Sequence, residues 1–376
     1  MAISMKEQPL WYKITNIEIL DTPALVVYKK RVEDNVKRLI QNIDDVTRLR
    51  PHIKTHKVKE VVKLMQSTGI QKFKCATIAE AELLGICAAE DILLAYQPVN
   101  NKLWRFIELI KQYPKTLFSC LVDSKEQVAE MSKMAFYHQV SLSVWIDING
   151  GMNRTGIDLE EAFALFLAIQ QYSNIIFAGF HLYDGHIREQ DFVLREQKCN
   201  ELFEQVEVLS KQVENVTLEK TKIVAGGTAT FPIHAKREAI ECSPGTFIYW
   251  DKGYADSFPE QAFDWAALVV STVVSIPQKN HLCLDLGYKA IASENPLPQR
   301  IYFLNEPEAV CLSHSEEHLV IKVPETHTYK VGDIFYGVPY HICPTCALYE
   351  DVTVVENYQI THQKWQIIAR NRKISI

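Results

Sequence analysis

Short apolar runs alternate with amphipathic segments over about the first two thirds of the chain. Most of these runs hold consecutive hydrophobic residues, which is typical of parallel strands buried on both faces. The segments between them carry apolar residues at helical spacing, such as Val32, Val36 and Leu39. The predicted strands span residues 24–28, 47–53, 72–77, 91–96, 117–123, 141–148, 175–183 and 223–227.

The repeat of about 25 to 30 residues has the length of one strand–helix unit, and eight such strands fit into this region. The pattern predicts an α/β fold with a (β/α)8 TIM barrel over residues 22–255; a doubly wound open sheet is the alternative. Residues 256–376 alternate apolar and polar positions between turns, which predicts a second, mostly antiparallel β domain. We expect residues 1–21 to pack on that domain and to include a strand at 14–20.

Composition excludes several classes of protein. Hydrophobic residues make up 47% of the chain and charged residues 23%, as in ordinary globular proteins. The net charge of −6 argues against nucleic-acid binding driven by bulk charge. No apolar run approaches the roughly 20 residues of a membrane span, and the first residues do not resemble a secretion signal. The nine cysteines show no zinc-finger spacing, so we expect free thiols and a cytoplasmic protein.

Polar motifs follow several of the predicted strands, where a parallel barrel carries its catalytic groups. Residues 50–57 (RPHIKTHK) would place the amine of Lys54 at the mouth of the barrel; a solvated turn is the alternative interpretation. Residues 147–156 (DINGGMNRTG) combine flexible glycines with Arg154, whose planar fork suits an anionic oxygen. Residues 179–186 (GFHLYDGH) bring the ring of Tyr183 to another strand end.

Two glycine–threonine turns predict a phosphate site. Gly227 and Thr228 lie in the sequence AGGT, and Gly245 and Thr246 lie in SPGT, after the last two strands of the predicted barrel. Barrels commonly bind phosphate at these two positions, through backbone amides and hydroxyl groups. The position of both turns therefore favours a ligand that carries a phosphate.

A histidine and a cysteine in the β domain form a candidate metal site. His341 and Cys343 are two residues apart, so an extended segment would present one nitrogen and one sulfur to the same side. Two protein ligands leave positions for water and substrate, which suits a catalytic metal. For an isolated pair of this kind, a buried cysteine beside a hydrogen-bonded histidine is the more frequent interpretation.

Taken together and in this order, the motifs resemble those of the fold-type III pyridoxal-phosphate enzymes. The similarity is to the alanine-racemase-like branch that contains D-threonine aldolases and eukaryotic-type D-serine dehydratases. It runs from residues 21–25 (DTPAL) to the His-x-Cys segment, and residues 50–57 are its most specific motif. The resemblance implies an alanine-racemase-type barrel with a β domain, and a homodimer.

The resemblance also implies roles for individual residues. Lys54 matches the lysine that forms the Schiff base with pyridoxal 5'-phosphate, with Lys57 as the nearest competitor. Further positions match the family's cofactor-binding residues and its metal ligands. The cofactor-binding set is Lys54, Arg154, Tyr183, Gly227, Thr228, Gly245, Thr246 and Tyr254, and the metal ligands are His341 and Cys343.

Departures from the family pattern leave the reaction open. Cys343 matches the zinc-dependent dehydratases, whereas aldolases carry an aspartate there and use Mn²⁺ or Mg²⁺; thiolate also prefers Zn²⁺ on chemical grounds. Residues 344–349, by contrast, look more like those of the aldolases, and Asn149-Gly150 replaces a shorter turn. We therefore expect a lyase acting on β-hydroxy D-amino acids, as a D-serine or D-threonine dehydratase, with aldol cleavage as the alternative. An amino-acid racemase comes third, and a non-catalytic pyridoxal-phosphate carrier is the hypothesis from another class.

Overall fold

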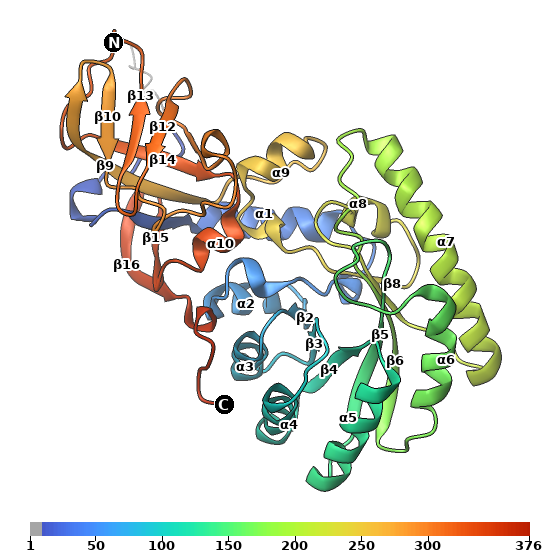
Figure 1. Cartoon of the computed structure of the whole chain (residues 1–376). Coiled ribbons are helices and arrows are strands. Elements are labelled where there is room, and N and C mark those ends of the chain that lie inside the picture. Colours follow the sequence, from blue (N-terminus) through green and yellow to red (C-terminus); the bar gives the residue numbers. More distant parts are fainter. Residues whose placement is uncertain (1–9) are drawn as a thin grey trace, which may run out of the picture. The chain divides into compact units, whose positions relative to one another are not determined.

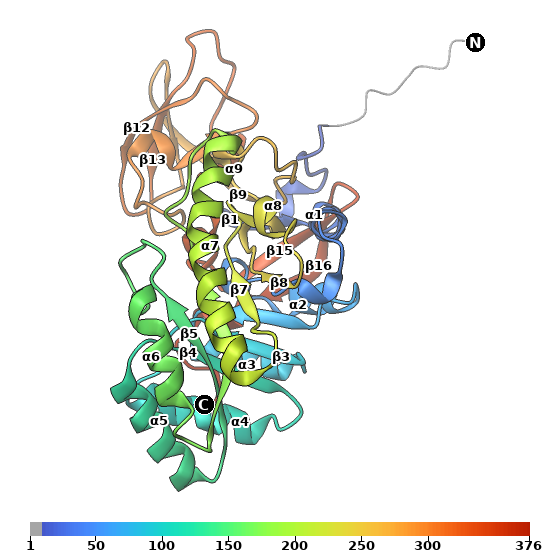
Figure 2. The same cartoon turned by 90° about the vertical axis from the view of Figure 1, so that its right-hand side faces the viewer.

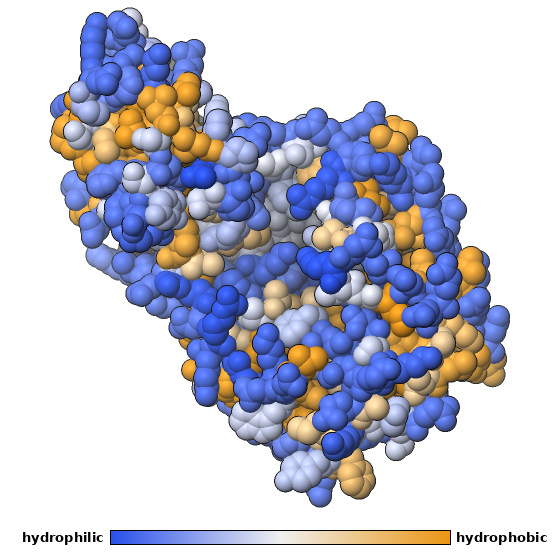
Figure 3. All heavy atoms as spheres, viewed as in Figure 1, coloured by the Kyte–Doolittle hydropathy of each residue, from blue (hydrophilic) through white to orange (hydrophobic). Residues whose placement is uncertain are grey.

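The computed structural model describes residues 10–376, which form two compact units, each with its own sheet (Figure 1). The barrel unit comprises Asn35–Ile248, Tyr254–Phe263 and Ile367–Ile376. The sheet unit comprises the chain up to Asp34, together with Tyr249–Gly253 and Asp264–Gln366. In the described part of the chain, no helix has both the length and the apolar character needed to cross a membrane. The face drawn in Figure 3 is mostly hydrophilic, with its apolar residues in separate patches.

The barrel unit contains seven parallel strands in sequential order from β2 to β8. Residues 49–52 occupy the eighth position, because Leu49 bridges Cys242 of β8 and His52 bridges Lys74 of β2. This closure confirms the predicted barrel. The strands are β2 (Lys72–Cys75), β3 (Asp91–Leu94), β4 (Leu117–Val122), β5 (Leu142–Ile148), β6 (Ile175–Leu182), β7 (Ile223–Ala225) and β8 (Ile240–Cys242).

Helices connect these strands on the outside of the barrel (Figures 1 and 2). Two of them begin with a capping side chain shortly after the preceding strand: Thr77 accepts a hydrogen bond from the amide of Glu80, and Ser124 accepts one from the amide of Gln127. The helices are α2 (Lys59–Gln66), α3 (Ile78–Ile86), α4 (Asn101–Gln112), α5 (Lys125–His138), α6 (Leu159–Ile169), α7 (Phe192–Thr217) and α8 (Phe231–His234), with α1 (Lys29–Gln41) and α9 (Lys252–Ser257) at the unit boundaries.

The sheet unit is built on nine strands, ordered β12-β13-β10-β9-β1-β15-β16, with the pair β11–β14 joined to β9. Its pairs are antiparallel except that β1 runs parallel to β15. The helix α10 (Ile342–Cys346) also belongs to this unit. The strands are β1 (Ala24–Tyr28), β9 (Ala267–Gln278), β10 (His281–Leu284), β11 (Ile301–Phe303), β12 (Val310–His314), β13 (Leu319–Lys322), β14 (Ile334–Pro339), β15 (Asp351–Glu356) and β16 (Gln359–Gln366).

Three of the predicted strands differ from the structure. The strand at 24–28 was expected to open the barrel but lies in the sheet unit, because a strand buried on both faces has the same apolar pattern in either setting. Residues 47–53 form only bridges, flanked by the 3₁₀ turns Val46–Arg48 and Ile53–Thr55. The strand predicted at 14–20 is instead a 3₁₀ turn at Ile17–Ile19.

The N-terminal segment packs within the sheet unit. Tyr12 and Ile14 belong to an apolar cluster with Val26, Leu268 and Tyr336 of the sheet. The amide of Ile14 also donates to the hydroxyl of Tyr336 at 3.4 Å. Residues 1–9, which we expected to pack here too, lie outside the described residues.

Candidate active site

A cavity of about 250 Å³ in the barrel unit holds the candidate cofactor lysine. Lys54 follows the closing segment, in the 3₁₀ turn Ile53–Thr55, and its amide donates to Nδ1 of His52 at 3.2 Å. Its Nζ lies 5.9 Å from the ring centroid of Tyr183, the residue directly after β6. The other lysine of the motif, Lys57, forms an ion pair with the buried carboxylate of Glu80. The geometry therefore favours Lys54 over Lys57 as the amine of the cavity.

Arg154 also lies close to the ring of Tyr183. Its guanidinium carbon is 5.3 Å from the centroid of Tyr183, and both residues line the cavity. The loop from β5 carries Arg154 back to the barrel, since the Ile157 amide donates to the carbonyl of Asp147 at 2.9 Å. Lys54, Arg154 and Tyr183, predicted from three separate motifs, thus meet in one cavity.

The two glycine–threonine turns also meet. The hydroxyl oxygen of Thr228 accepts hydrogen bonds from the amides of Gly245 and Thr246, both at 3.0 Å. A side chain at Gly227 would lie 3.0 Å from the Tyr183 ring, so this turn is packed directly against the cavity. A side chain at Gly245 would approach the backbone of His52, two residues before Lys54.

These residues fit pyridoxal phosphate. The backbone amides of Gly245 and Thr246 converge on one oxygen, and the hydroxyl of Ser243 beside them is buried with no hydrogen-bond partner among the described residues. The cationic side chains of Lys54 and Arg154 line the cavity together with one carboxylate, that of Asp147. An anionic group with a phosphate and an aldehyde would give the Ser243 hydroxyl a partner and would neutralise the excess positive charge.

Tyr254 lies elsewhere in the barrel unit. It belongs to α9, where its ring packs against Phe258 at a centroid distance of 5.4 Å. It is not among the residues that line the Lys54 cavity. Its predicted contact with the cofactor therefore stays a prediction.

The cavity contains a buried chain of three polar side chains, of which Asp147 and His181 belong to the motifs at 147–156 and 179–186 and Lys74 belongs to none. Nζ of Lys74, on β2, lies 2.9 Å from Nε2 of His181, and Nδ1 of His181 lies 2.7 Å from Asp147. Burial would raise the pKa of Asp147, but the hydrogen bond from His181 lowers it overall. Burial, followed by the charge of Lys74, lowers the pKa of His181. The ring is therefore neutral at neutral pH, with its proton on Nδ1 and a free electron pair on Nε2.

His341 and Cys343 lie in the sheet unit. His341 is extended and precedes α10, whereas Cys343 is already helical, so the pair is not on one extended segment as expected. Nδ1 of His341 is 2.5 Å from Oε1 of Glu294. Burial alone would lower the pKa of His341, but hydrogen bonds to Cys343 and Glu294 raise it to about 9. The pair offers the nitrogen and sulfur donors that zinc prefers, and Glu294 is a residue that the sequence motifs missed.

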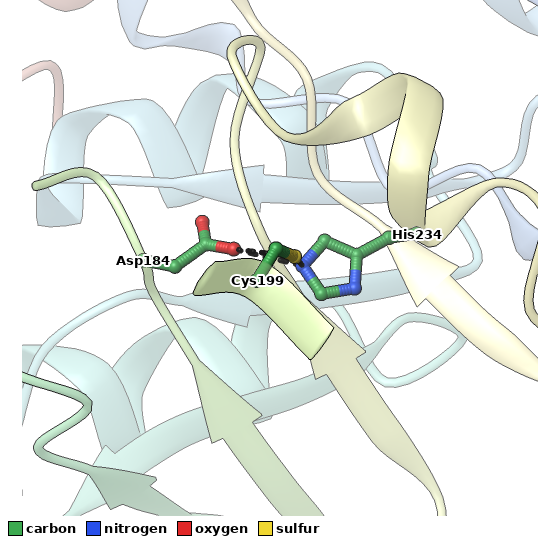
Figure 4. A group of neighbouring side chains, drawn as sticks. All are labelled: Asp184, Cys199 and His234. Carbon is green, nitrogen blue, oxygen red and sulfur yellow. Dashed lines mark hydrogen bonds and ion pairs between the residues drawn. The ribbon is translucent and has the colours of Figure 1, made fainter. Parts of the chain in front are cut away.

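A second group with metal-binding atoms lies in the barrel unit, where Asp184, Cys199 and His234 bring their donor atoms within 4.8 Å of one another (Figure 4). Nε2 of His234 is 2.8 Å from Asp184, whose other oxygen accepts from the hydroxyl of Thr230 at 2.7 Å. Arg237 donates to Nδ1 of His234 at 3.3 Å. This bond places the proton of a neutral ring on Nε2, so the group is held together by hydrogen bonds in the structure described.

Comparisons with known proteins agree with this architecture. The family model described as "Alanine racemase, N-terminal domain" matches residues 27–252, and the model described as "Putative serine dehydratase domain" matches residues 266–355. A D-threonine aldolase from Arthrobacter sp is 25% identical over 362 residues, which cover 93% of each chain.

Solved structures share the fold. The crystal structure of D-threonine aldolase from Filomicrobium marinum superposes with a TM-score of 0.85 at 22% identity, covering 97% of this chain and 99% of that one. D-threo-3-hydroxyaspartate dehydratase from Delftia sp. HT23 superposes with a TM-score of 0.78 at 20% identity, covering 93% and 97%. The chain belongs to the family of the alanine racemase N-terminal domain, which confirms the resemblance to fold-type III pyridoxal-phosphate enzymes that its motifs indicated.

Proposed function

We propose that the protein is a pyridoxal-phosphate-dependent lyase that converts β-hydroxy D-amino acids to 2-oxo acids and ammonia, as D-serine and D-threonine dehydratases do. The observation that carries the dehydratase assignment is the thiol of Cys343 two residues after His341. Solved structures of D-threo-3-hydroxyaspartate dehydratase include a histidine-to-alanine mutant and, two positions further on, a cysteine-to-alanine mutant in the metal-free form. This spacing equals that of His341 and Cys343.

The side chains in and around the cavity have separate roles in the proposed reaction. Lys54 would hold the cofactor covalently and, once released by the substrate amine, would take the proton from the α-carbon. Thr228, with the amides of Gly245 and Thr246, would bind the phosphate. Arg154 would pair with an anionic oxygen of the ring. Pyridoxal phosphate, when bound, supplies the conjugated system that stabilises negative charge at the α-carbon.

The metal pair, His341 and Cys343, would serve the other requirement of a dehydratase, the loss of the substrate hydroxyl group. His341 and Cys343 would hold Zn²⁺, whose Lewis acidity assists the loss of a hydroxyl group. Glu294 is bonded to Nδ1 of His341, which leaves Nε2 as the nitrogen available to a metal. A carboxylate in this position orients the ring and makes it a better ligand. A Mn²⁺ or Mg²⁺ ion would be a poorer match for the thiol.

Aldol cleavage to glycine and an aldehyde is the second candidate. It is favoured by the D-threonine aldolase of Arthrobacter, which aligns over nearly the whole chain. A racemase ranks third, because it has no use for the metal pair. A non-catalytic carrier of the cofactor ranks last, because the barrel is followed by a second domain that matches the serine dehydratase model.

Product analysis with D-threonine separates these reactions. Protein loaded with cofactor and zinc should yield 2-oxobutanoate and ammonia. Glycine with acetaldehyde would instead establish the aldolase, and L-allo-threonine would establish epimerisation at the α-carbon. Cys343→Ala should retain the cofactor absorbance and lose turnover, while the control Cys311→Ala, at a cysteine of β12, should retain both. Unchanged turnover in Cys343→Ala would contradict the metal role.

We also propose a homodimer located in the cytoplasm. The family resemblance supports the dimer, and the nine cysteines, none of which forms a disulfide in the structure, support a reducing compartment. Native mass spectrometry of the purified protein should give twice the mass of one 376-residue chain. A monomer at micromolar concentration would contradict the dimer.

A further inference from the structure

The proposed function leaves one amine of the cavity without a role. Lys74 is only 3% exposed, yet it lines the same cavity as Lys54. Its Nζ lies 5.6 Å from the ring centroid of Tyr183, and Nζ of Lys54 lies 5.9 Å from that centroid. A lysine pointing into a barrel is costly to bury, because the interior positions of such barrels usually carry branched apolar residues. The position of Lys74 therefore calls for a chemical explanation.

The partners of Lys74 have the arrangement of an activated nucleophile. The electron pair on Nε2 of His181 accepts a hydrogen bond from Nζ of Lys74 at 2.9 Å. On the other side of the ring, Nδ1 donates to Asp147 at 2.7 Å, which fixes both the tautomer and the orientation of the ring. A nucleophile, a base within hydrogen-bond reach and a third group that orients the base are the three parts such sites share.

The charges around Lys74 favour its neutral, nucleophilic form. Burial and then the charge of Lys54 lower the pKa of Lys74 to about 7, and Arg50 acts in the same direction. The carboxylates of Asp147 and Asp184 oppose this shift without reversing it. Desolvation beside another cation is a recognised way to activate a lysine for attack on a carbonyl group. The further groups that line the cavity around Lys74 are His52, Tyr96, Arg154, His181 and Tyr183.

We propose that Lys74 is a second carbonyl-binding amine, activated by His181 and Asp147, that forms an imine with an aldehyde in the Lys54 cavity. Nζ attacks the carbonyl carbon, the carbonyl electron pair moves to oxygen, and the proton lost from Nζ passes to Nε2 of His181. His181 returns that proton to the oxygen, which gives a carbinolamine with one hydroxyl group. The second proton of Nζ then passes through Nε2 to that hydroxyl, the nitrogen electron pair closes the carbon–nitrogen double bond, and the carbon–oxygen bond breaks with release of one water. The Asp147 carboxylate stabilises the ring while it is charged. The cofactor as the source of the aldehyde rests on the proposed function, and an aldehyde product rests on its second candidate, aldol cleavage.

Trapping in a Lys54→Ala variant tests the cofactor as the source. The variant is incubated with pyridoxal phosphate and sodium cyanoborohydride, which reduces an imine to a stable amine, and the labelled peptide is identified by mass spectrometry. We expect the label on Lys74. It should be absent from Lys54→Ala/Lys74→Met and retained in Lys54→Ala/Lys72→Met, in which the neighbouring lysine of the same strand is removed. Thermal melting of each variant checks that it is folded.

A second arm uses acetaldehyde with the cofactor-free protein, in which Lys54 is present. If acetaldehyde and the reductant add an ethyl group to Lys74 faster than to Lys72 at neutral pH, small aldehydes are identified as ligands. Labelling in the first arm alone would assign the cofactor aldehyde. Labelling of Lys74 in neither arm would overturn the proposal. Reduction of the wild-type protein loaded with pyridoxal phosphate is read separately, since failure to label Lys54 there contradicts the proposed function and not the role of Lys74.

The role of His181 has its own test. If His181 accepts the proton of Lys74, then replacing it by asparagine should slow labelling of Lys74 by about 100-fold, the usual effect of a general base. A residue that only supports the fold would change melting and leave the labelling rate per folded molecule unchanged. An unchanged rate in His181→Asn would therefore overturn the activation by His181.

Discussion

The closure of the barrel depends on a buried ion network, and its disruption should destabilise the barrel unit measurably. Arg50, in the closing segment, is fully buried. Its Nη1 and Nη2 atoms bond Asp91 of β3 at 2.7 and 2.8 Å, and its Nε bonds Glu241 of β8 at 2.7 Å. Burial would lower the pKa of Arg50, but its hydrogen bonds to Asp91 and the charge of Glu241 raise it overall. The guanidinium therefore links two strands on either side of the closure.

Glu241→Ala removes one of the two carboxylates and leaves Nε of Arg50 buried without an acceptor. Breaking a buried pair costs about 3 to 5 kcal/mol. Because Asp91 still neutralises the charge, we expect the lower end, about 3 kcal/mol. Glu241→Gln keeps an acceptor and loses only the charge, so its cost should be about 1 kcal/mol.

Urea unfolding followed by tryptophan fluorescence measures this loss. The guanidinium carbon of Arg50 lies 5.7 Å from the ring centroid of Trp145, so this tryptophan reports on the network directly. The midpoint should fall with an unchanged slope. The control Glu196→Ala breaks the exposed pair with Lys236 and should cost less than about 0.5 kcal/mol. Equal midpoints for Glu241→Ala and Glu196→Ala would refute the reasoning.

Other residues give further predictions. Lys54→Ala/Lys74→Met, which lacks both amines of the cavity, should lose the absorbance of the bound cofactor, which the exposed control Lys59→Ala should retain. Removal of zinc with a chelator should abolish turnover while that absorbance persists, and added zinc should restore it. Gly226→Ala should weaken cofactor binding in equilibrium dialysis and destabilise the fold by about 1 to 2 kcal/mol, because φ is +73° and the new carbon would lie 2.6 Å from the ring of His234. Burial lowers the pKa of His56 from 6.5 to about 3, so only the unfolded chain takes up a proton between these values. Stability should therefore fall on acidification below pH 6.5, by about 3 kcal/mol at pH 4, and His56→Gln should remove that part of the slope in urea titrations.

The sequence predicts much of the barrel because its strands are apolar and their ends carry distinctive residues. Lys54, Arg154 and Tyr183 could be placed at one mouth because the ends of parallel strands lie at the same edge. The strand at 24–28 was misplaced, since an apolar run does not specify which sheet buries it. The closing segment at 49–52 could not be recognised as irregular, because its bridges depend on β2 and β8 being in position.

The buried polar network of the cavity was not predictable for a different reason. Lys74, Asp147 and His181 lie on three strands; the motifs included Asp147 and His181, but they indicated neither Lys74 nor the contacts among the three. Whether such residues meet depends on strand register, and a shift of one residue would turn them to the opposite face. Glu294 was missed because it lies far from His341 in the chain and no motif surrounds it.

The closing segment is joined to its neighbours in the barrel by few backbone hydrogen bonds. The amides of Arg50 and His52 donate to β8 and the residues after it, and the amide of Lys74 donates back to Pro51, whereas β5 and β6 pair along seven positions. A ligand attached to Lys54 on one side of this join and to Thr228 on the other would bind only the closed ring. At 100 times its Kd, such a ligand adds about 2.7 kcal/mol to the free energy of opening. Bound cofactor would then stabilise the closed barrel in addition to taking part in the reaction. Newly made protein without cofactor would open at the closing segment more readily than protein with cofactor.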